Sequence, residues 1–427
     1  METQVRKYPI GTQDFKILRE NDFLYVDKTE FLYTLVTRSR QIFLSRPRRF
    51  GKSLFLSTLK YYFLGEKELF KGLKISELEK DWIEYPVFHI EFNNESYVDI
   101  HSLNQALETN LSKLEKIWGR EINEKTPSSR LSGLIERAAE KTGKRVVVLV
   151  DEYDKPLLST MDNDKLNEEF RTALKGFYGV LKSEDAYLRF AFLTGVTKFS
   201  KVSIFSDLNQ LRDISMTEEF SEICGISETE LRTNFTLDVE RLAEKNKMNI
   251  DDTFGKLKKY YDGYHFSMHH EGMYNPFSLL NVFADKHFGN YWFATGTPTF
   301  LVKMLKNAKL DISKLEDGTR ISAFSIMDYR AENKNPIPVM YQSGYLTIKG
   351  FDEEQNQYIL GYPNEEVKYG FLNELLFVYY SAAKNSFEEL TEIDYNNFVN
   401  DLLGEQVDTF MQRLQVFFSG FSYDLEN

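Results

Sequence analysis

Four short runs rich in apolar residues recur along the first half of the chain, and segments with helical spacing separate them. The runs are residues 42–44, 85–92, 146–150 and 188–196. The third run contains only valine and leucine, and such a run suits a central parallel strand that helices cover on both sides. Residues 164–182, between the third and fourth runs, carry the pattern of a helix. The alternation predicts an α/β fold with a parallel sheet.

The second half of the chain has a different pattern. From about residue 217 to residue 281 the apolar residues recur at helical spacing, which predicts a helical segment that packs as a lid beside a bound ligand. Residues 344–363 place two apolar stretches around a polar centre, as in a β-hairpin, and helical segments follow. A chain of 427 residues is too long for one compact core. We therefore expect a core at residues 1–215, a helical lid at 216–285 and a mixed α+β region at 286–427.

A basic loop follows the first apolar run and ends in Gly51, Lys52 and Ser53, and an apolar helix is predicted to begin near Leu54. This order of strand, loop and helix is the layout of a phosphate-binding P-loop, in which backbone N–H groups and the helix N-terminus cradle phosphate oxygens. We expect Lys52 to contact the β- and γ-phosphates and Ser53 to bind Mg²⁺. The standard pattern has glycine where this chain has Arg46. A Gly-Lys-Ser helix start without a ligand is the alternative.

An acidic pair, Asp151 and Glu152, follows the third apolar run. Open α/β sheets bind ligands at this end of their strands. We expect Asp151 to hold Mg²⁺, directly or through water, and Glu152 to orient and deprotonate the attacking water. A strand and a helix between the two motifs are typical of the additional-strand, catalytic-glutamate class of P-loop proteins, which often place a polar residue at the tip of the strand after the acidic pair. Thr194 or Thr197, at the tip of that strand, would then sense the γ-phosphate, and a strand-capping hydroxyl is the alternative.

The motifs thus predict a set of site residues. Glu152 and Lys52 are expected to be catalytic, and Ser53 and Asp151 are expected to bind the metal ion. The residues expected to bind the nucleotide are Arg48, Arg49, Phe50, Gly51, Lys52, Ser53, Leu54 and Thr194.

Composition narrows the class of protein. Aromatic residues make up 15% of the chain, which indicates ordered globular structure. The one cysteine, Cys224, excludes an intrachain disulfide and a multi-cysteine metal site, and it fits a reducing cytosol. The N-terminus lacks the apolar core of a signal peptide, and no stretch approaches the roughly 20 apolar residues of a membrane span. We therefore expect a soluble, cytoplasmic protein without a membrane partner.

The charge of the chain indicates which kinds of partner it could bind. The net charge of −12 opposes non-specific attachment to nucleic acid, although a local basic patch leaves such a partner open. The densest basic cluster is Arg38, Arg40, Arg46, Arg48 and Arg49. Because these residues surround the expected P-loop, triphosphate binding explains them more simply than DNA binding does. A protein partner or a homo-oligomer also stays open.

Several stretches resemble the AAA-ATPase-like family of bacterial proteins. They are RPRRFGKSLFLSTL, VLVDEYDKP, FLTGVTKFSKVSIFSDLNQLRDIS, YDGYHF, YNPFSLLN and YQSGYLTIKGF. Arg46 agrees with the RPRRFGKS form of this family. The resemblance implies ATP as the nucleotide, and it implies that the segment before the P-loop covers the adenine. Tyr25 and Lys28 are then expected contacts, with a purely structural role as the alternative.

Members of this family commonly carry a C-terminal PD-(D/E)XK nuclease-like domain. Asp352 and the triplet 366–368 superficially fit such a site, in which two carboxylates bind Mg²⁺ and a lysine orients water. However, Asn364 is a good N-cap for a helix through Leu376, which would place the triplet on the wrong kind of element. The chain also ends near the point where the nuclease-like domain would begin, so we expect that domain to be absent.

Three functional hypotheses follow. The first is a Mg²⁺-dependent ATPase whose hydrolysis drives or times a conformational change. The second is a regulatory module that holds ATP as a switch and turns it over slowly or not at all, and the third is the ATPase module of a nucleic-acid-processing protein. Glu152 favours the first, whereas the lack of an identifiable arginine finger favours the second. Arg48, Arg49 and Arg212 are candidates for that finger, with surface or ion-pair roles as the alternative.

Overall fold

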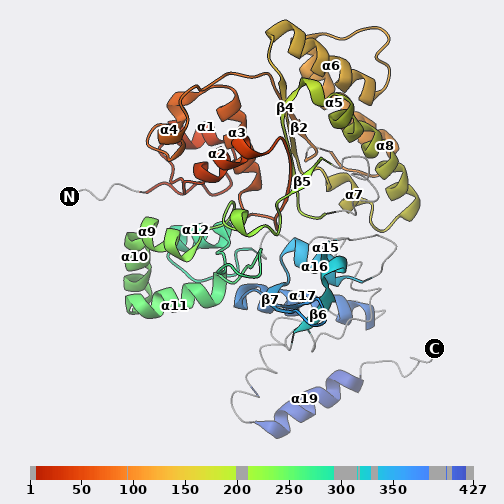
Figure 1. Ribbon diagram of the computed structural model, residues 1–427. Coiled ribbons are helices and arrows are strands. Elements are labelled where there is room, and N and C mark those ends of the chain that lie inside the picture. Colours follow the sequence, from red (N-terminus) through yellow and green to blue (C-terminus); the bar gives the residue numbers. More distant parts are fainter. Residues whose placement is uncertain are drawn as a thin grey trace.

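A computed structural model of the chain describes residues 6–93, 95–198, 210–292, 315, 318–327, 335–383, 401 and 406–419. Residues 199–209 of the motif that begins FLTGV, and much of the region 286–427, lie outside these ranges. In Figure 1 the sheet of the N-terminal half lies between two groups of helices, and the later elements pack below it.

Helices occur in both halves of the chain. The helices of the N-terminal half are α1 (Phe15–Glu20), α2 (Thr29–Arg38), α3 (Lys52–Phe63), α4 (Ile75–Leu78), α5 (Ile100–Trp118), α6 (Pro127–Thr142), α7 (Lys155–Ser159) and α8 (Asp164–Ser183). Later helices are α9 (Glu228–Asn234), α10 (Thr236–Asn246), α11 (Ile250–Tyr261), α12 (Pro276–Asp285), α15 (Ala323–Met327), α16 (Ile337–Ser343), α17 (Glu365–Ala383) and α19 (Val407–Ser419). Short 3-10 helices cover Lys67–Phe70, Asp185–Tyr187 and Glu218–Phe220.

The strands form two sheets. They are β1 (Gln41–Ser45), β2 (Val87–Glu91), β3 (Val146–Asp151), β4 (Leu188–Gly195), β5 (Arg212–Asp213), β6 (Thr319–Ser322), β7 (Thr347–Asp352) and β8 (Gln357–Gly361). The first sheet has the order β2-β3-β4-β1-β5, and all its pairings are parallel. The second has the antiparallel order β6-β8-β7, which confirms the predicted hairpin.

Each face of the parallel sheet is covered by its own helices. On β3, the side chains of Val147 and Leu149 pack into one cluster with residues of α2 and α3. Val146, Val148 and Val150 pack into the other with residues of α5, α6 and α8. All five side chains are buried, as expected for a strand that is apolar on both faces. The α/β fold predicted from this pattern is confirmed, and it fits a P-loop NTPase-like core.

The C-terminal ends of three strands meet at one edge of the sheet. Strand β4 lies between β1 and β3, and its residue Gly195 is paired with Ser45, the last residue of β1. On the other side of β4, β3 ends in Asp151. The loop after β1 and the acidic pair after β3 therefore lie at the same edge, although about 100 residues separate them in the sequence.

The later part of the chain packs in two further groups. Helices α9 to α12 share a cluster of buried apolar residues that includes Leu231, Leu257 and Leu279. The hairpin β7-β8 and helices α16 and α17 contribute to the same cluster as α2 and α3. No helix among the described residues is long and apolar enough to cross a membrane. The boundaries at residues 215 and 285 stay predictions.

Candidate functional site

A cleft of about 360 Å³ opens at this edge of the sheet. Five separate parts of the chain form it: the segment before α1, the segments that follow β1, β2 and β3, and the start of α12. Its lining residues are Pro9, Ile10, Gly11, Thr12, Gln13, Arg48, Arg49, Gly51, Lys52, Ser53, Leu54, Asn93, Glu152, Lys155, Pro276, Phe277 and Leu280. Most of the site residues predicted from the sequence thus line one cleft of a size common for ligand sites.

The loop after β1 has the backbone geometry of a helix start. Gly51 has a φ angle of +91° and precedes the first residue of α3, Lys52; α3 thus begins earlier than the expected position near Leu54. The Nζ atom of Lys52 donates hydrogen bonds to the backbone oxygens of Arg46 (3.0 Å) and Pro47 (3.1 Å). Burial lowers the pKa of Lys52, whereas the carboxylates of Glu152, Asp151 and Asp154 oppose that shift.

The acidic pair lies against the start of α3. The Ser53 side chain lies beside the Asp151 carboxyl, so the two predicted metal ligands are neighbours. Burial raises the pKa of Asp151 to about 6, and the Ser53 side chain opposes the shift. Glu152 has a φ angle of +49°, a conformation that is uncommon for residues other than glycine, and its N–H donates to Oδ1 of Asp151 at 3.0 Å. This turn brings Glu152 to the wall of the cleft.

Arg46 has a role that the motif did not predict. Its side chain is 1% exposed, and its guanidinium donates to the backbone oxygens of Ser45 (2.9 Å), Ser215 (2.6 Å) and Phe220 (2.9 Å). It also lies 4.0 Å over the Phe266 ring. Explaining Arg46 by triphosphate binding was therefore wrong, because both terminal nitrogens of its buried guanidinium donate to carbonyl oxygens of the protein.

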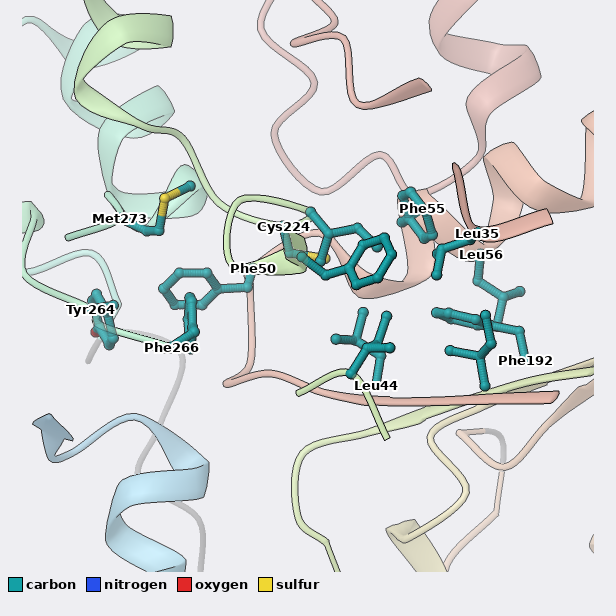
Figure 2. Close-up of a cluster of buried hydrophobic side chains, with 14 of the residues drawn as sticks. Leu35, Leu44, Phe50, Phe55, Leu56, Phe192, Cys224, Tyr264, Phe266 and Met273 are labelled. Carbon is teal, nitrogen blue, oxygen red and sulfur yellow. The ribbon is translucent and has the colours of Figure 1, made fainter. Parts of the chain in front are cut away.

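The next residues of the loop contact later segments of the chain. The Phe50 ring packs edge-on against Tyr264 and Phe266, with ring centroids 4.7 and 5.3 Å apart, and Figure 2 shows Phe50 pointing toward these rings. Arg49, with a φ angle of +67°, lies 4.8 Å over the Phe277 ring. The Arg48 carbonyl accepts a 3.4 Å hydrogen bond from the indole of Trp292. Arg48 and Arg49 line the cleft, whereas Phe50 faces the core.

Thr194 and Thr197 have buried partners within the protein. The Thr194 hydroxyl donates to the backbone oxygen of Leu44 at 2.9 Å, and the Thr197 hydroxyl donates to Asp154 at 2.7 Å. Both residues are fully buried, and neither lines the cleft. Such bonds agree with the alternative in which the hydroxyls cap the end of the strand. A role of either threonine in sensing the γ-phosphate stays a prediction.

A smaller apolar pocket of about 90 Å³ adjoins the cleft. Residues that line both are Pro9, Gly51, Leu54, Pro276 and Leu280. The wall of the small pocket includes Tyr25, Lys28 and Cys224. Lys28 forms a 2.6 Å ion pair with Glu230 of α9, and the Tyr25 hydroxyl lies 3.5 Å from that of Thr58. The two residues expected at the adenine therefore share one pocket beside the P-loop.

The comparisons with known proteins agree with this geometry. A family model described as predicted AAA-ATPase matches residues 9–205. The chain is also 40% identical, over 383 residues, to a protein of Azotobacter chroococcum mcd 1 described as an uncharacterized protein in the vnfD 5′ region. That match spans 88% of this chain and 70% of the relative. The chain belongs to the predicted AAA-ATPase family. This confirms the resemblance found in the motifs, and it indicates ATP binding and hydrolysis in general terms.

In this predicted AAA-ATPase, Arg38 and Arg40 of the basic cluster, and also Arg212, have partners away from the cleft. Arg38 pairs with Glu219 at 2.6 Å, and Arg40 donates to the backbone oxygen of Leu188 at 2.8 Å. Arg212 donates to the Ser39 hydroxyl at 3.0 Å and also lies near Glu219. The ion-pair alternative therefore describes Arg212, and Arg38 and Arg40 have partners of their own. Arg48 and Arg49 are left as the candidate arginines at the cleft.

The sequence analysis did not predict four polar residues that line the cleft of the predicted AAA-ATPase: Thr12, Gln13, Asn93 and Lys155. Lys155 begins α7 soon after the acidic pair, and that position was a usable signal. The segment before α1 gave no local signal, because tertiary contacts place it. The Tyr8 hydroxyl donates to Asp238 of α10 at 2.7 Å, and Arg6 pairs with the same carboxylate.

The residues present fit a magnesium ion. No cluster of three or more histidine, cysteine or acidic residues among the described positions could hold a metal ion by itself. Ser53 and Asp151 instead offer two oxygen ligands beside the cleft. Mg²⁺ is commonly bound in this way, through one or two carboxylates together with substrate phosphates and waters.

The residues that superficially matched a nuclease site lie elsewhere in the predicted AAA-ATPase. Oδ1 of Asn364 accepts the N–H of Val367 at 3.0 Å, and the helix predicted after Asn364 is confirmed as α17. Glu366 is buried on this helix and accepts bonds from the Ser278 hydroxyl and the Trp292 N–H, both at 2.8 Å. Glu366 therefore holds α17 against neighbouring segments.

Proposed function

We propose that this predicted AAA-ATPase binds ATP with Mg²⁺ in the cleft and hydrolyses it, and that hydrolysis drives a conformational change. The observation that carries the proposal is the meeting of Lys52, Ser53 and Glu152 in one cleft, with Asp151 beside Ser53. Phosphate-binding and water-activating groups from two distant motifs thus lie together. A helix start without a ligand would not require an acidic pair at its mouth.

Each residue has a distinct role in this proposal. The N–H groups at the start of α3 and the Lys52 ammonium bind phosphate oxygens. Lys52 exchanges its bonds with the carbonyls of Arg46 and Pro47 for bonds to the ligand. Mg²⁺ held by Ser53 and Asp151 would neutralise charge on the phosphate oxygens. Glu152 accepts a proton from the attacking water, and Arg48 and Arg49 offer cations at the same cleft.

The strand order supports a finer assignment. Strand β4 lies between the strand of the P-loop and the strand of the acidic pair. An additional strand at this place is the feature that names the additional-strand, catalytic-glutamate class of P-loop proteins. We assign the core to this class, with Glu152 as its catalytic glutamate. The start of α12 contributes to the cleft wall, which supports a lid role for the helical segment.

A test of the phosphate site uses Lys52→Ala. We expect the Kd for Mg·ATP, measured by isothermal titration calorimetry, to rise at least about tenfold, because a charge-assisted hydrogen bond to phosphate is worth about 1.5–3 kcal/mol. Lys60→Ala, in the last turn of the same helix α3, is the matched control and should bind as the wild type does. Unchanged affinity in Lys52→Ala would contradict the site. Tight binding by the wild type without turnover would favour the regulatory switch instead.

The small pocket is proposed to hold the nucleotide base, and its cysteine permits a direct test. Cys224 is the chain's one cysteine, it is 3% exposed, and burial raises its pKa. A maleimide should therefore label it slowly, and bound ATP should slow labelling at least about tenfold by filling the pocket. Mass spectrometry of the labelled chain measures the rate.

Two controls separate the base from the phosphates in this test. Inorganic triphosphate occupies a phosphate site without filling a base pocket, so it should protect Cys224 much less than ATP does. Cys224→Ser gives the background of the reagent. Equal labelling rates with and without bound ATP would place the base elsewhere.

A further inference from the structure

Gln342 joins the C-terminal part of the chain to the end of strand β4. It lies on α16 and is buried. Its Oε1 atom accepts the backbone N–H of Lys198 at 2.8 Å, and its Nε2 atom donates to the backbone oxygen of Ile326 at 3.0 Å. Both ends of the amide therefore have partners, which fixes its orientation.

The segment that Gln342 holds is also bonded to the acidic-pair loop. Asp154 accepts the N–H groups of Val196 (3.0 Å) and Thr197 (2.6 Å), as well as the Thr197 hydroxyl. The Tyr153 hydroxyl donates to the Thr197 carbonyl at 2.8 Å. Tyr153 and Asp154 directly follow Glu152 in the sequence. Residues 196–198 thus lie between the loop that carries Glu152 and helix α16, with hydrogen bonds to both.

The same end of α16 touches the P-loop. Gly344 follows α16 with a φ angle of +92°, and a side chain there would place its Cβ atom 2.7 Å from the Cβ atom of Pro47. The Pro47 carbonyl is one of the two that accept a bond from Lys52. The C-terminal end of α16, with Gly344, therefore lies directly against the P-loop. Residues 196–198 connect it to the loop that carries the acidic pair.

We propose that Gln342 is a positioning residue for hydrolysis, which fixes residues 196–198 and through them the backbone behind Glu152. The proposal rests on the proposed ATPase function. Gln342 does not line the cleft, so it touches no substrate and its loss should not weaken nucleotide binding. Loss of the Gln342 side chain should instead slow the chemical step, because a small displacement of a reacting group lowers the rate of reaction strongly.

The test compares three variants of the full chain. Gln342→Met keeps the size of the side chain and removes both hydrogen bonds, whereas Gln342→Glu keeps an acceptor for the Lys198 N–H. Ser343→Ala is the matched control, because its hydroxyl donates to the Val339 carbonyl of the same helix at 2.6 Å and has no other hydrogen-bond partner among the described residues. We expect Gln342→Met to lower kcat about tenfold with the Kd for Mg·ATP within about twofold of wild type. Gln342→Glu should keep most of kcat, and Ser343→Ala should resemble wild type.

The outcomes separate this inference from the function on which it rests. Wild-type turnover together with an unchanged kcat in Gln342→Met would overturn the positioning role and leave the ATPase function standing. A fall in kcat of similar size in Ser343→Ala would also overturn it, because general loosening of α16 would then be the cause. A wild type that binds Mg·ATP without turnover would overturn both.

Discussion

Replacing Glu152 with glutamine should abolish most ATP turnover while leaving ATP binding intact. Glutamine keeps the shape of the side chain and the backbone turn, but it cannot accept a proton from water. General-base catalysis contributes about 10²–10⁴-fold to rate, so we expect kcat to fall at least about 10²-fold. Steady-state phosphate release measures kcat, and calorimetry measures the Kd for Mg·ATP, which should stay within about threefold of wild type.

A neighbouring carboxyl provides the matched control for this prediction. Glu91 ends β2 and is paired in register with Asp151, but it does not line the cleft. Glu91→Gln should therefore turn ATP over within a few-fold of wild type. If Glu152→Gln retained the turnover of wild type, another group would have to activate the water, and our assignment of the catalytic glutamate would be wrong.

The core of the fold could be predicted from the sequence because its signals are local. A run such as residues 146–150 has no polar position that could face solvent, so it identifies a strand buried on both faces. The hairpin at residues 347–361 and the helix after Asn364 follow from similar local patterns. Spacing also placed Lys52 and Glu152 at one sheet edge, since parallel strands end on the same side.

What the sequence did not predict depends on contacts between distant segments. Asp238 on α10 binds Arg6 and Tyr8, and this places the segment 9–13 at the cleft. Likewise, Gln342 lies 144 positions from the residue whose N–H it accepts. Nothing in the local pattern of either segment marks such a partner, because a polar residue in a loop or a helix has many possible neighbours.

Arg46 shows how a motif can be matched while one of its positions is misread. The general pattern has glycine there, and a basic residue beside a P-loop suggests a phosphate ligand. In the structure, the Arg46 guanidinium instead donates its hydrogen bonds to the backbone oxygens of Ser45, Ser215 and Phe220. Arg46 thereby joins the P-loop to the segment that leads into α9, a task that glycine could not perform.

Changing Arg46 to glycine, which restores the general motif, should therefore destabilise the protein. The change removes the donors of three backbone carbonyls and the contact with Phe266. Buried acceptors left without donors cost about 1–3 kcal/mol each, although partial relaxation and entry of water reduce their sum. We expect the free energy of unfolding, measured in urea by circular dichroism, to fall by about 3 kcal/mol or more.

Arg38 gives the control that decides between packing and charge as the cause. It carries the same charge in the same basic cluster, but its side chain is 66% exposed and its ion pair with Glu219 lies at the surface. Such pairs contribute about 0–1 kcal/mol. Arg38→Gly should therefore cost far less than Arg46→Gly, even though glycine also lowers helix propensity at the end of α2. Equal costs would show that Arg46 acts only through its charge. A large cost confined to Arg46 would mean that this arginine, at the position of the standard glycine, is a structural link between the P-loop and later segments of the chain.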